Sequence, residues 1–155
     1  MAGKSKNIPT LAEWVGGLES LRALTKHFYK KVPQDLLLAP VFARMDTHHA
    51  HHVAAFTTEV FGGPKAYSAD GGSHAHMIDR HPKERLRKRW LASMLETADE
   101  VGVASDPEFR AAFVGYLEWG TRLAVLNSQD GVAPALQAAP MPALNWGPPG
   151  GPWQG

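Results

Sequence analysis

The chain has 155 residues and a formal net charge of +1, with 44% hydrophobic and 20% charged residues. These values are typical of one globular domain with a full-sized core, and they give no electrostatic argument for nucleic acid or an anionic membrane as a partner. The chain has no cysteine, which excludes disulfides, thiolate metal sites and iron–sulfur clusters. Because no apolar leader or membrane-spanning run is visible, we expect a cytoplasmic protein.

Two helices are expected in the first third of the chain. Thr10 and Glu13 have the spacing of a capping box, which predicts a short helix that ends at the glycines 16–17. A stripe of apolar residues at helical spacing predicts a second helix, which Pro33 ends. The stripe consists of Leu21, Leu24, Phe28 and Val32. A leucine-rich segment then leads through Pro40 to Phe42.

A third helix is predicted from Asp46 to Phe61, with Val53, Phe56 and Val60 on one face. Two glycines and a proline at 62–64 then form a strong stop signal. A loop follows, with an Asp-Gly-Gly turn at 70–72. The segment from Ser73 to Arg80 has room for a short helix.

Two long helices are predicted in the second half. The first starts near Lys83, where Leu86, Trp90 and Met94 recur every four residues. The basic run that opens this helix is typical of a solvated helix face. The second starts at Asp106-Pro107, a cap residue followed by a proline at the first helical position, and continues to about Asn127. Phe109, Phe113, Tyr116 and Leu123 lie along it.

Residues 129–155 differ from the rest because they are rich in proline and glycine and have no periodicity. We interpret them as an irregular tail, laid over the surface at most by its two tryptophans. No alternating strand pattern is visible, so the fold class is all-α. The expected organisation is an N-terminal extension at 1–9, one helical domain at 10–128 and the tail at 129–155.

Seven of the eight histidines fall between positions 48 and 81, in the stretches "HHAHH" and "HAHMIDRH". A single histidine here is most simply a solvated surface residue, but seven on or beside helices favour a site. His48 or His49 could share a helix face with His52 and bind a non-haem metal, although the motifs of zinc proteases and di-iron bundles are absent. A non-covalent haem is the third interpretation. It needs one neutral imidazole and an apolar slot, for which Phe56 and Met77 are among the available side chains.

Residues 11–127 resemble the truncated haemoglobins, and within them group II. The resemblance is carried by five stretches: "HFYKKVPQDLLLAPVF", "HHVAAFTTEVFGGPKAY", "HMIDRH", "RLRKRWLASM" and "DPEFRAAFVGYLEWGTRLAV". It implies a bacterial globin of two-over-two helical sandwich fold around haem b. It also implies dioxygen or another diatomic molecule as ligand.

The resemblance further implies roles for single residues. His81 matches the proximal histidine that binds iron, and Tyr29 matches the distal tyrosine of the second helix. Trp90 matches the group II tryptophan of the distal pocket. Phe42 matches the aromatic residue against the haem face. His49 and Val53 match the distal-helix residues that face the bound ligand. The family's propionate contacts match His52, Tyr67 and Arg80.

The proximal assignment has an alternative, because His81 and Trp90 are about four residues closer than in the family. Pro82 directly follows His81 and predicts a helix end there. Counting back from Trp90 instead favours His76, with His74 as a further candidate.

Two classes of function follow from haem: diatomic ligand chemistry, including nitric oxide dioxygenase or peroxidase-like activity served by an unidentified reductase, and ligand sensing. A non-haem metal-binding helical protein is the alternative outside haem. The resemblance is compatible with a monomer or a homodimer. A Soret band in the absorbance spectrum distinguishes the haem interpretation from the alternative.

Overall fold

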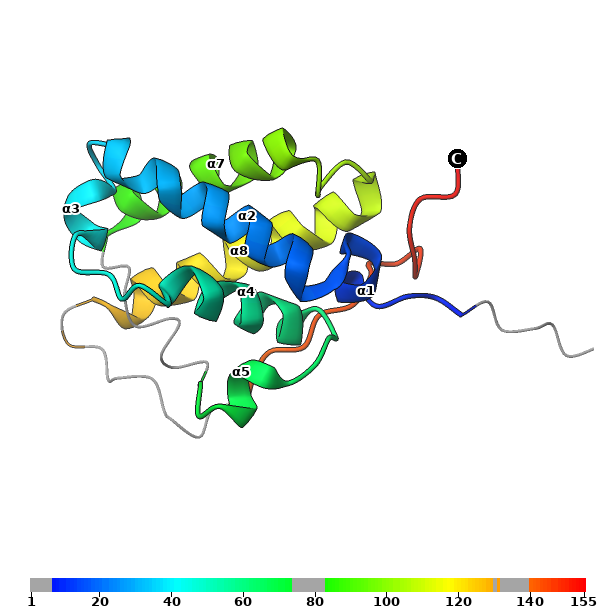
Figure 1. Cartoon of the computed structure of the whole chain (residues 1–155). Helices are drawn as coiled ribbons and strands as arrows, with labels where there is room; N and C mark the ends of the chain where they lie inside the picture. The colour runs from blue at the N-terminus through cyan, green and yellow to red at the C-terminus, as the bar shows by residue number, and fades with distance from the viewer. Residues whose placement is uncertain (1–6, 74–82, 130, 132–139) are drawn as a thin grey trace, which may run out of the picture.

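The computed structural model describes residues 7–73, 83–129, 131 and 140–155, and all regular secondary structure within these ranges is helical. The helices are α1 (Leu11–Val15), α2 (Gly17–Lys31), α3 (Ala39–Phe42), α4 (His49–Val60), α5 (Ala66–Ala69), α7 (Glu84–Val101) and α8 (Pro107–Asn127), with a 3-10 turn at Val32–Gln34. Helix α2 packs against α4, and α7 packs against α8, while α2 also contacts α7 (Figure 1). The all-α prediction is confirmed. No helix among the described residues is long and apolar enough to cross a membrane.

The two helix starts with the clearest sequence signals are confirmed. The Thr10 side chain accepts a hydrogen bond from the backbone N–H of Glu13 at 3.0 Å, and the Glu13 carboxylate accepts one from the backbone N–H of Thr10 at 3.4 Å. Gly16 ends α1 with a φ of 104°, which a residue with a side chain rarely adopts. At the start of α8, the Asp106 carboxylate accepts hydrogen bonds from the backbone N–H groups of the next turn.

The third helix begins later than predicted. The Asp46 carboxylate accepts a hydrogen bond from the backbone N–H of His48 at 2.7 Å, which forms a turn, and α4 begins only at His49. Helix α5 was not predicted, because four residues are too short to show a period. The short helix expected at Ser73–Arg80 falls largely outside the described residues.

The apolar stripe predicted for the second helix is buried in full along α2 and the 3-10 turn that follows, and aromatic residues of α4 and α8 meet it in one core. Phe28 and Phe109 are completely buried, and Phe113 is 1% exposed. The rings of Phe109 and Phe113 stack at 5.8 Å, and Phe61, at the end of α4, meets both of them edge-on. Each such ring contributes roughly 1.5–3 kcal/mol through burial, so this cluster holds α4 onto α8.

One residue of the basic run corrects the expectation of a solvated helix face. Arg87 is only 3% exposed, whereas the other basic residues between 83 and 89 are exposed. Its guanidinium donates to the Glu84 carboxylate at 2.5 and 2.8 Å and to the Glu118 carboxylate at 2.9 Å. Arg87 therefore links α7 to α8, and its long side chain contributes packing as well as charge.

The tail has no regular structure within residues 140–155, as predicted, but its two tryptophans differ. Trp153 is 61% exposed and lies on the surface. Trp146 is 8% exposed, and its indole N–H donates to the carbonyl of Pro9 at 2.8 Å. Its ring packs edge-on against Trp14, at 5.9 Å between ring centroids. The tail thus runs beside α1 and places one tryptophan in the core (Figure 1).

We expect Trp146→Ala to lower the free energy of unfolding by about 3 kcal/mol, because it removes a buried ring and leaves a cavity. Trp153→Ala is the matched control. It removes an exposed ring of the same tail and should change stability by less than about 0.5 kcal/mol. Urea unfolding of both variants measures the difference. Equal effects would show that Trp146 is not part of the core.

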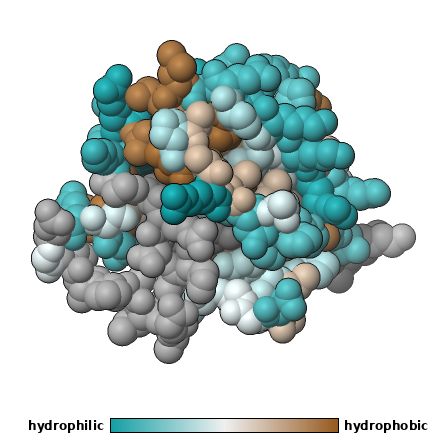
Figure 2. Space-filling view, turned by 60° about the vertical axis from the view of Figure 1, so that its left-hand side comes forward, coloured by the Kyte–Doolittle hydropathy of each residue, from teal (hydrophilic) through white to brown (hydrophobic). Residues whose placement is uncertain are grey.

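On the face that carries α3, apolar side chains gather beside hydrophilic ones (Figure 2). Two apolar residues of this region, Leu36 and Val41, are 94% and 40% exposed. Val41 also lines a large cavity, so this apolar surface adjoins the interior of the molecule.

Candidate functional site

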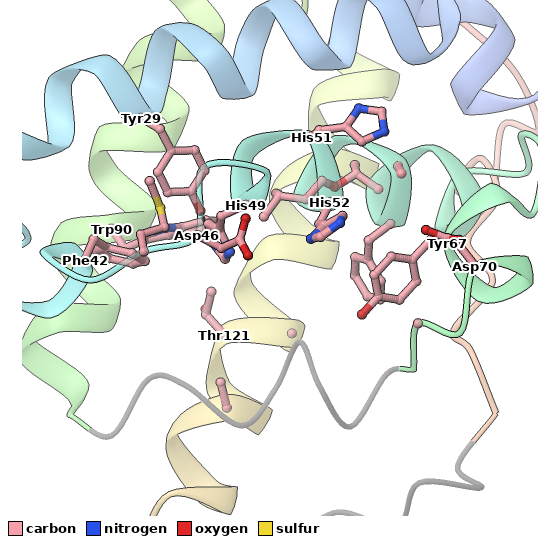
Figure 3. A pocket seen from close by; sticks show the side chains of 18 of the residues that line it. Tyr29, Phe42, Asp46, His49, His51, His52, Tyr67, Asp70, Trp90 and Thr121 are labelled. Carbon is pink, nitrogen blue, oxygen red and sulfur yellow. Dashed lines mark hydrogen bonds between the residues drawn. The ribbon is translucent and has the colours of Figure 1, made fainter.

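One cavity of about 860 Å³ lies among the helices, within the range of roughly 300–1,000 Å³ typical of cofactor and small-molecule sites. All the predicted site residues that the structure describes line this single cavity. They are Tyr29, Phe42, His49, His52, Val53, Tyr67 and Trp90. They come from α2, α3, α4, α5 and α7, so residues far apart in sequence converge on one space (Figure 3).

The remaining predicted site residues fall outside the described residues. They are Met77, Arg80 and His81, together with the alternative proximal ligands His74 and His76. Gly72 and Trp90, which flank this segment along the chain, both line the cavity. The assignment of the iron ligand therefore stays a prediction.

Three side chains with polar groups meet at one end of the cavity (Figure 3). The hydroxyl of Tyr29, on α2, lies 3.1 Å from Nε2 of His49, in the first turn of α4. The two rings meet edge-on at 5.0 Å, and Phe42 packs edge-on against Tyr29 at 5.8 Å. Trp90 joins them from α7, with its ring edge-on to the buried Phe28 at 5.4 Å.

The Tyr29 hydroxyl is a neutral donor at physiological pH. Burial raises the pKa of Tyr29 well above its usual range, and the indole N–H of Trp90 opposes this shift without cancelling it. A phenol that keeps its proton offers one O–H donor and two acceptor lone pairs. This end of the cavity can therefore donate hydrogen bonds to a small electron-rich ligand.

Tyr67 occupies the other end of the cavity, where its hydroxyl donates to the backbone carbonyl of Ser73 at 2.9 Å. Its ring packs edge-on against Phe56 at 5.2 Å. The buried carboxylate of Glu59, on α4, accepts a hydrogen bond from the backbone N–H of Ser68 at 2.9 Å and so fixes α5. The wall carrying Tyr67 is therefore held to α4.

Charged and ionisable side chains also line the cavity, on the segment that leads into α4. Arg44 and Asp46 are exposed lining residues that sequence analysis did not place in the site. The backbone N–H of His48 holds the pKa of Asp46 below its usual range, so its carboxylate is charged at neutral pH. Neither residue has a sequence signal that points to a binding site, because single charges before a helix are common.

Helix α8 forms a further wall of the cavity and was also missed as a site element. Tyr116, Gly120 and Ala124 recur every four residues and line the cavity, together with Thr121. This spacing is visible in the sequence, but the same stripe is equally typical of a core helix.

The described residues include no group of three or more histidine, aspartate or glutamate side chains arranged to hold a metal ion. His48 and His52 have ring centroids 6.4 Å apart, and no third ligand of this kind joins them in the described part of the chain.

Comparison with known proteins identifies the family. Residues 10–118 match the model of the bacterial-like globins. The chain is 34% identical over 124 residues to the group 2 truncated haemoglobin YjbI of Bacillus subtilis, covering 77% of this chain and 89% of that protein. The chain belongs to the group II truncated haemoglobins. It is also 37% identical over 96 residues to a group 1 truncated haemoglobin of Nostoc commune, covering 54% of this chain and 81% of that protein.

Solved structures agree with this assignment. The group II truncated haemoglobin of Bacillus anthracis has a TM-score of 0.69 at 25% identity, covering 77% of this chain and 93% of that one. The truncated oxygen-avid haemoglobin of B. subtilis has a TM-score of 0.66 at 29% identity, covering 76% and 99%. The truncated haemoglobin fold expected from the resemblance is thus confirmed, with α2 and α4 over α7 and α8.

Globins bind haem, and the described residues of this truncated haemoglobin fit that group. Val53, Phe56, Leu117 and Ala124 provide apolar walls to the cavity. A flat apolar cofactor needs such walls, and its ligand needs donors at one face. The Tyr29 side of the cavity provides the donors.

Proposed function

We propose that this truncated haemoglobin holds one non-covalent haem b in the cavity and reversibly binds dioxygen or another diatomic molecule there. The observation that carries the proposal is the convergence of Tyr29, His49 and Trp90 at one end of a cofactor-sized cavity. One related structure, from B. subtilis, is described as oxygen-avid, which supports dioxygen as the ligand.

When bound, haem supplies an iron centre that takes a diatomic ligand. His81 would bind the iron, with His76 as the alternative. Tyr29 and Trp90 donate hydrogen bonds to the ligand, since both side chains are buried and carry a donor toward the cavity. Phe42 and Val53 shape the ligand's surroundings.

The propionates need polar groups at the rim of the cavity. His52 is exposed and lines the cavity, so a haem propionate that extends toward solvent can contact its ring. Arg80 and Tyr67 are the further residues that the family resemblance suggests. Arg44 is also exposed and lines the cavity, and its guanidinium can bind a carboxylate through a bidentate pair of hydrogen bonds.

Carbon monoxide binding to the reduced, haem-loaded protein tests the proposed function. We expect the absorbance spectrum to change on addition of carbon monoxide and to revert when the gas is removed. The same cycle should occur with dioxygen. A reduced protein whose spectrum does not respond to saturating carbon monoxide would have no ligand position, and the proposal would then be wrong.

Acid–butanone extraction tests how the haem is held. We expect it to remove all the haem, because the chain has no cysteine for a thioether link. The extracted group should give the pyridine haemochrome spectrum of haem b. Haem that stays with the polypeptide would contradict the non-covalent assignment.

A further inference from the structure

The contact between Tyr29 and His49 joins α2 and α4. The distance alone does not say which of the two residues donates the hydrogen bond. Tyr29 is 8% exposed and comes from α2, whereas His49 is half-buried at the start of α4. The phenol oxygen and Nε2 are 3.1 Å apart. At this distance a hydrogen bond forms, with either Tyr29 or His49 as the donor.

Counting hydrogen-bonding groups distinguishes the two directions. A phenol has one O–H donor and two acceptor lone pairs. If Tyr29 donates to His49, its only O–H is used and a lone pair faces the cavity. If His49 donates through Nε2–H, one lone pair is used and the O–H is left for a ligand.

We propose that His49 is a positioning residue: its Nε2–H donates to the Tyr29 oxygen and turns the Tyr29 O–H toward the bound diatomic ligand. This inference rests on the proposed function. It assigns His49 a role through Tyr29 rather than a direct contact with the ligand.

A bound ligand with partial negative charge favours this arrangement. Such a ligand is attracted by the O–H of Tyr29 and repelled by its lone pair, and both effects are strong in an apolar cavity. With His49 as donor, the Tyr29 oxygen accepts one hydrogen bond and its O–H stays available to donate to the ligand. The reverse direction leaves the ligand without the Tyr29 donor. His49 therefore determines whether Tyr29 can stabilise the ligand.

A double-mutant cycle on dioxygen dissociation tests this role. Tyr29→Phe should speed dissociation about five- to 150-fold, and His49→Leu alone about two- to tenfold. In the Tyr29→Phe background, His49→Leu should have no further effect, because no hydroxyl remains to be oriented. His49→Gln should restore much of the parent rate, since its amide N–H can donate to Tyr29.

His48→Leu is the matched control. His48 is the exposed neighbour of His49 and does not line the cavity, so the same substitution there should leave the dissociation rate unchanged. It removes the same polar ring from the histidine-rich segment without touching Tyr29.

Spectroscopy of the carbon monoxide complex gives a second readout. Nitrogen-15 NMR should show a proton on Nε2 of His49, and the carbon monoxide stretch should move to higher wavenumber in both His49→Leu and Tyr29→Phe. An unprotonated Nε2, or a His49→Leu effect that persists in the Tyr29→Phe background, would overturn the inference. Failure of the parent protein to bind haem or carbon monoxide would instead overturn the proposed function, and this inference with it.

Discussion

Tyr29→Phe should speed dioxygen release roughly five- to 150-fold. The substitution removes a hydrogen bond of about 1–3 kcal/mol and leaves the partial negative charge of the bound ligand without this donor in an apolar pocket. The association rate should change less, since the donor acts only after the ligand has entered. The buried position of Tyr29 and its protonated hydroxyl support this expectation. Stopped-flow mixing with dithionite measures the release rate.

Trp90→Phe should act in the same direction, because its indole N–H is the second donor that lines the cavity. The substitution keeps an aromatic ring against Phe28 and removes the N–H together with the five-membered ring of the indole. If His49→Leu alone speeds release while the Tyr29 and Trp90 variants behave like the parent, His49 is the direct donor. If all three variants are silent, the assignment of this end of the cavity as the ligand site is wrong.

His81→Gly should release most of the haem, because the iron loses its proposed axial imidazole. Added imidazole should restore haem retention by occupying the vacated position. His76→Gly is measured under identical conditions as the competing assignment. The readouts are haem content and the low-field NMR signal of the iron-bound histidine.

The outcome for His76→Gly decides between the two histidines. We expect His76→Gly to keep both its haem and the low-field signal. If only His76→Gly loses that signal, the proximal ligand is His76, and the connection to α7 is not shortened relative to the family.

The fold could be predicted where side chains act on the nearby backbone. The capping box at Thr10 and the Asp106-Pro107 start are local signals, and both helices begin where they indicate. The start of α4 was misplaced because Asp46 caps a turn rather than the helix itself. The burial of Arg87 could not be predicted, because it depends on carboxylates on two helices.

The candidate site was predicted largely from family resemblance, and its seven described residues line one cavity. Periodicity alone does not separate a cofactor pocket from a core, as the stripe on α8 shows. The hydrogen bond between Tyr29 and His49 depends on how α2 and α4 pack, which no local pattern encodes. The same holds for Trp146, whose partner Pro9 lies at the other end of the chain.

Titration of haemin into the haem-free protein, followed by Soret absorbance, tests the central claim most directly. We predict saturation at one haem per chain, because one cofactor-sized cavity collects all the described site residues. Tryptophan fluorescence should be quenched in parallel, since Trp90 lines that cavity. A protein that gives no Soret band with excess haemin but binds zinc or iron ions would contradict the account.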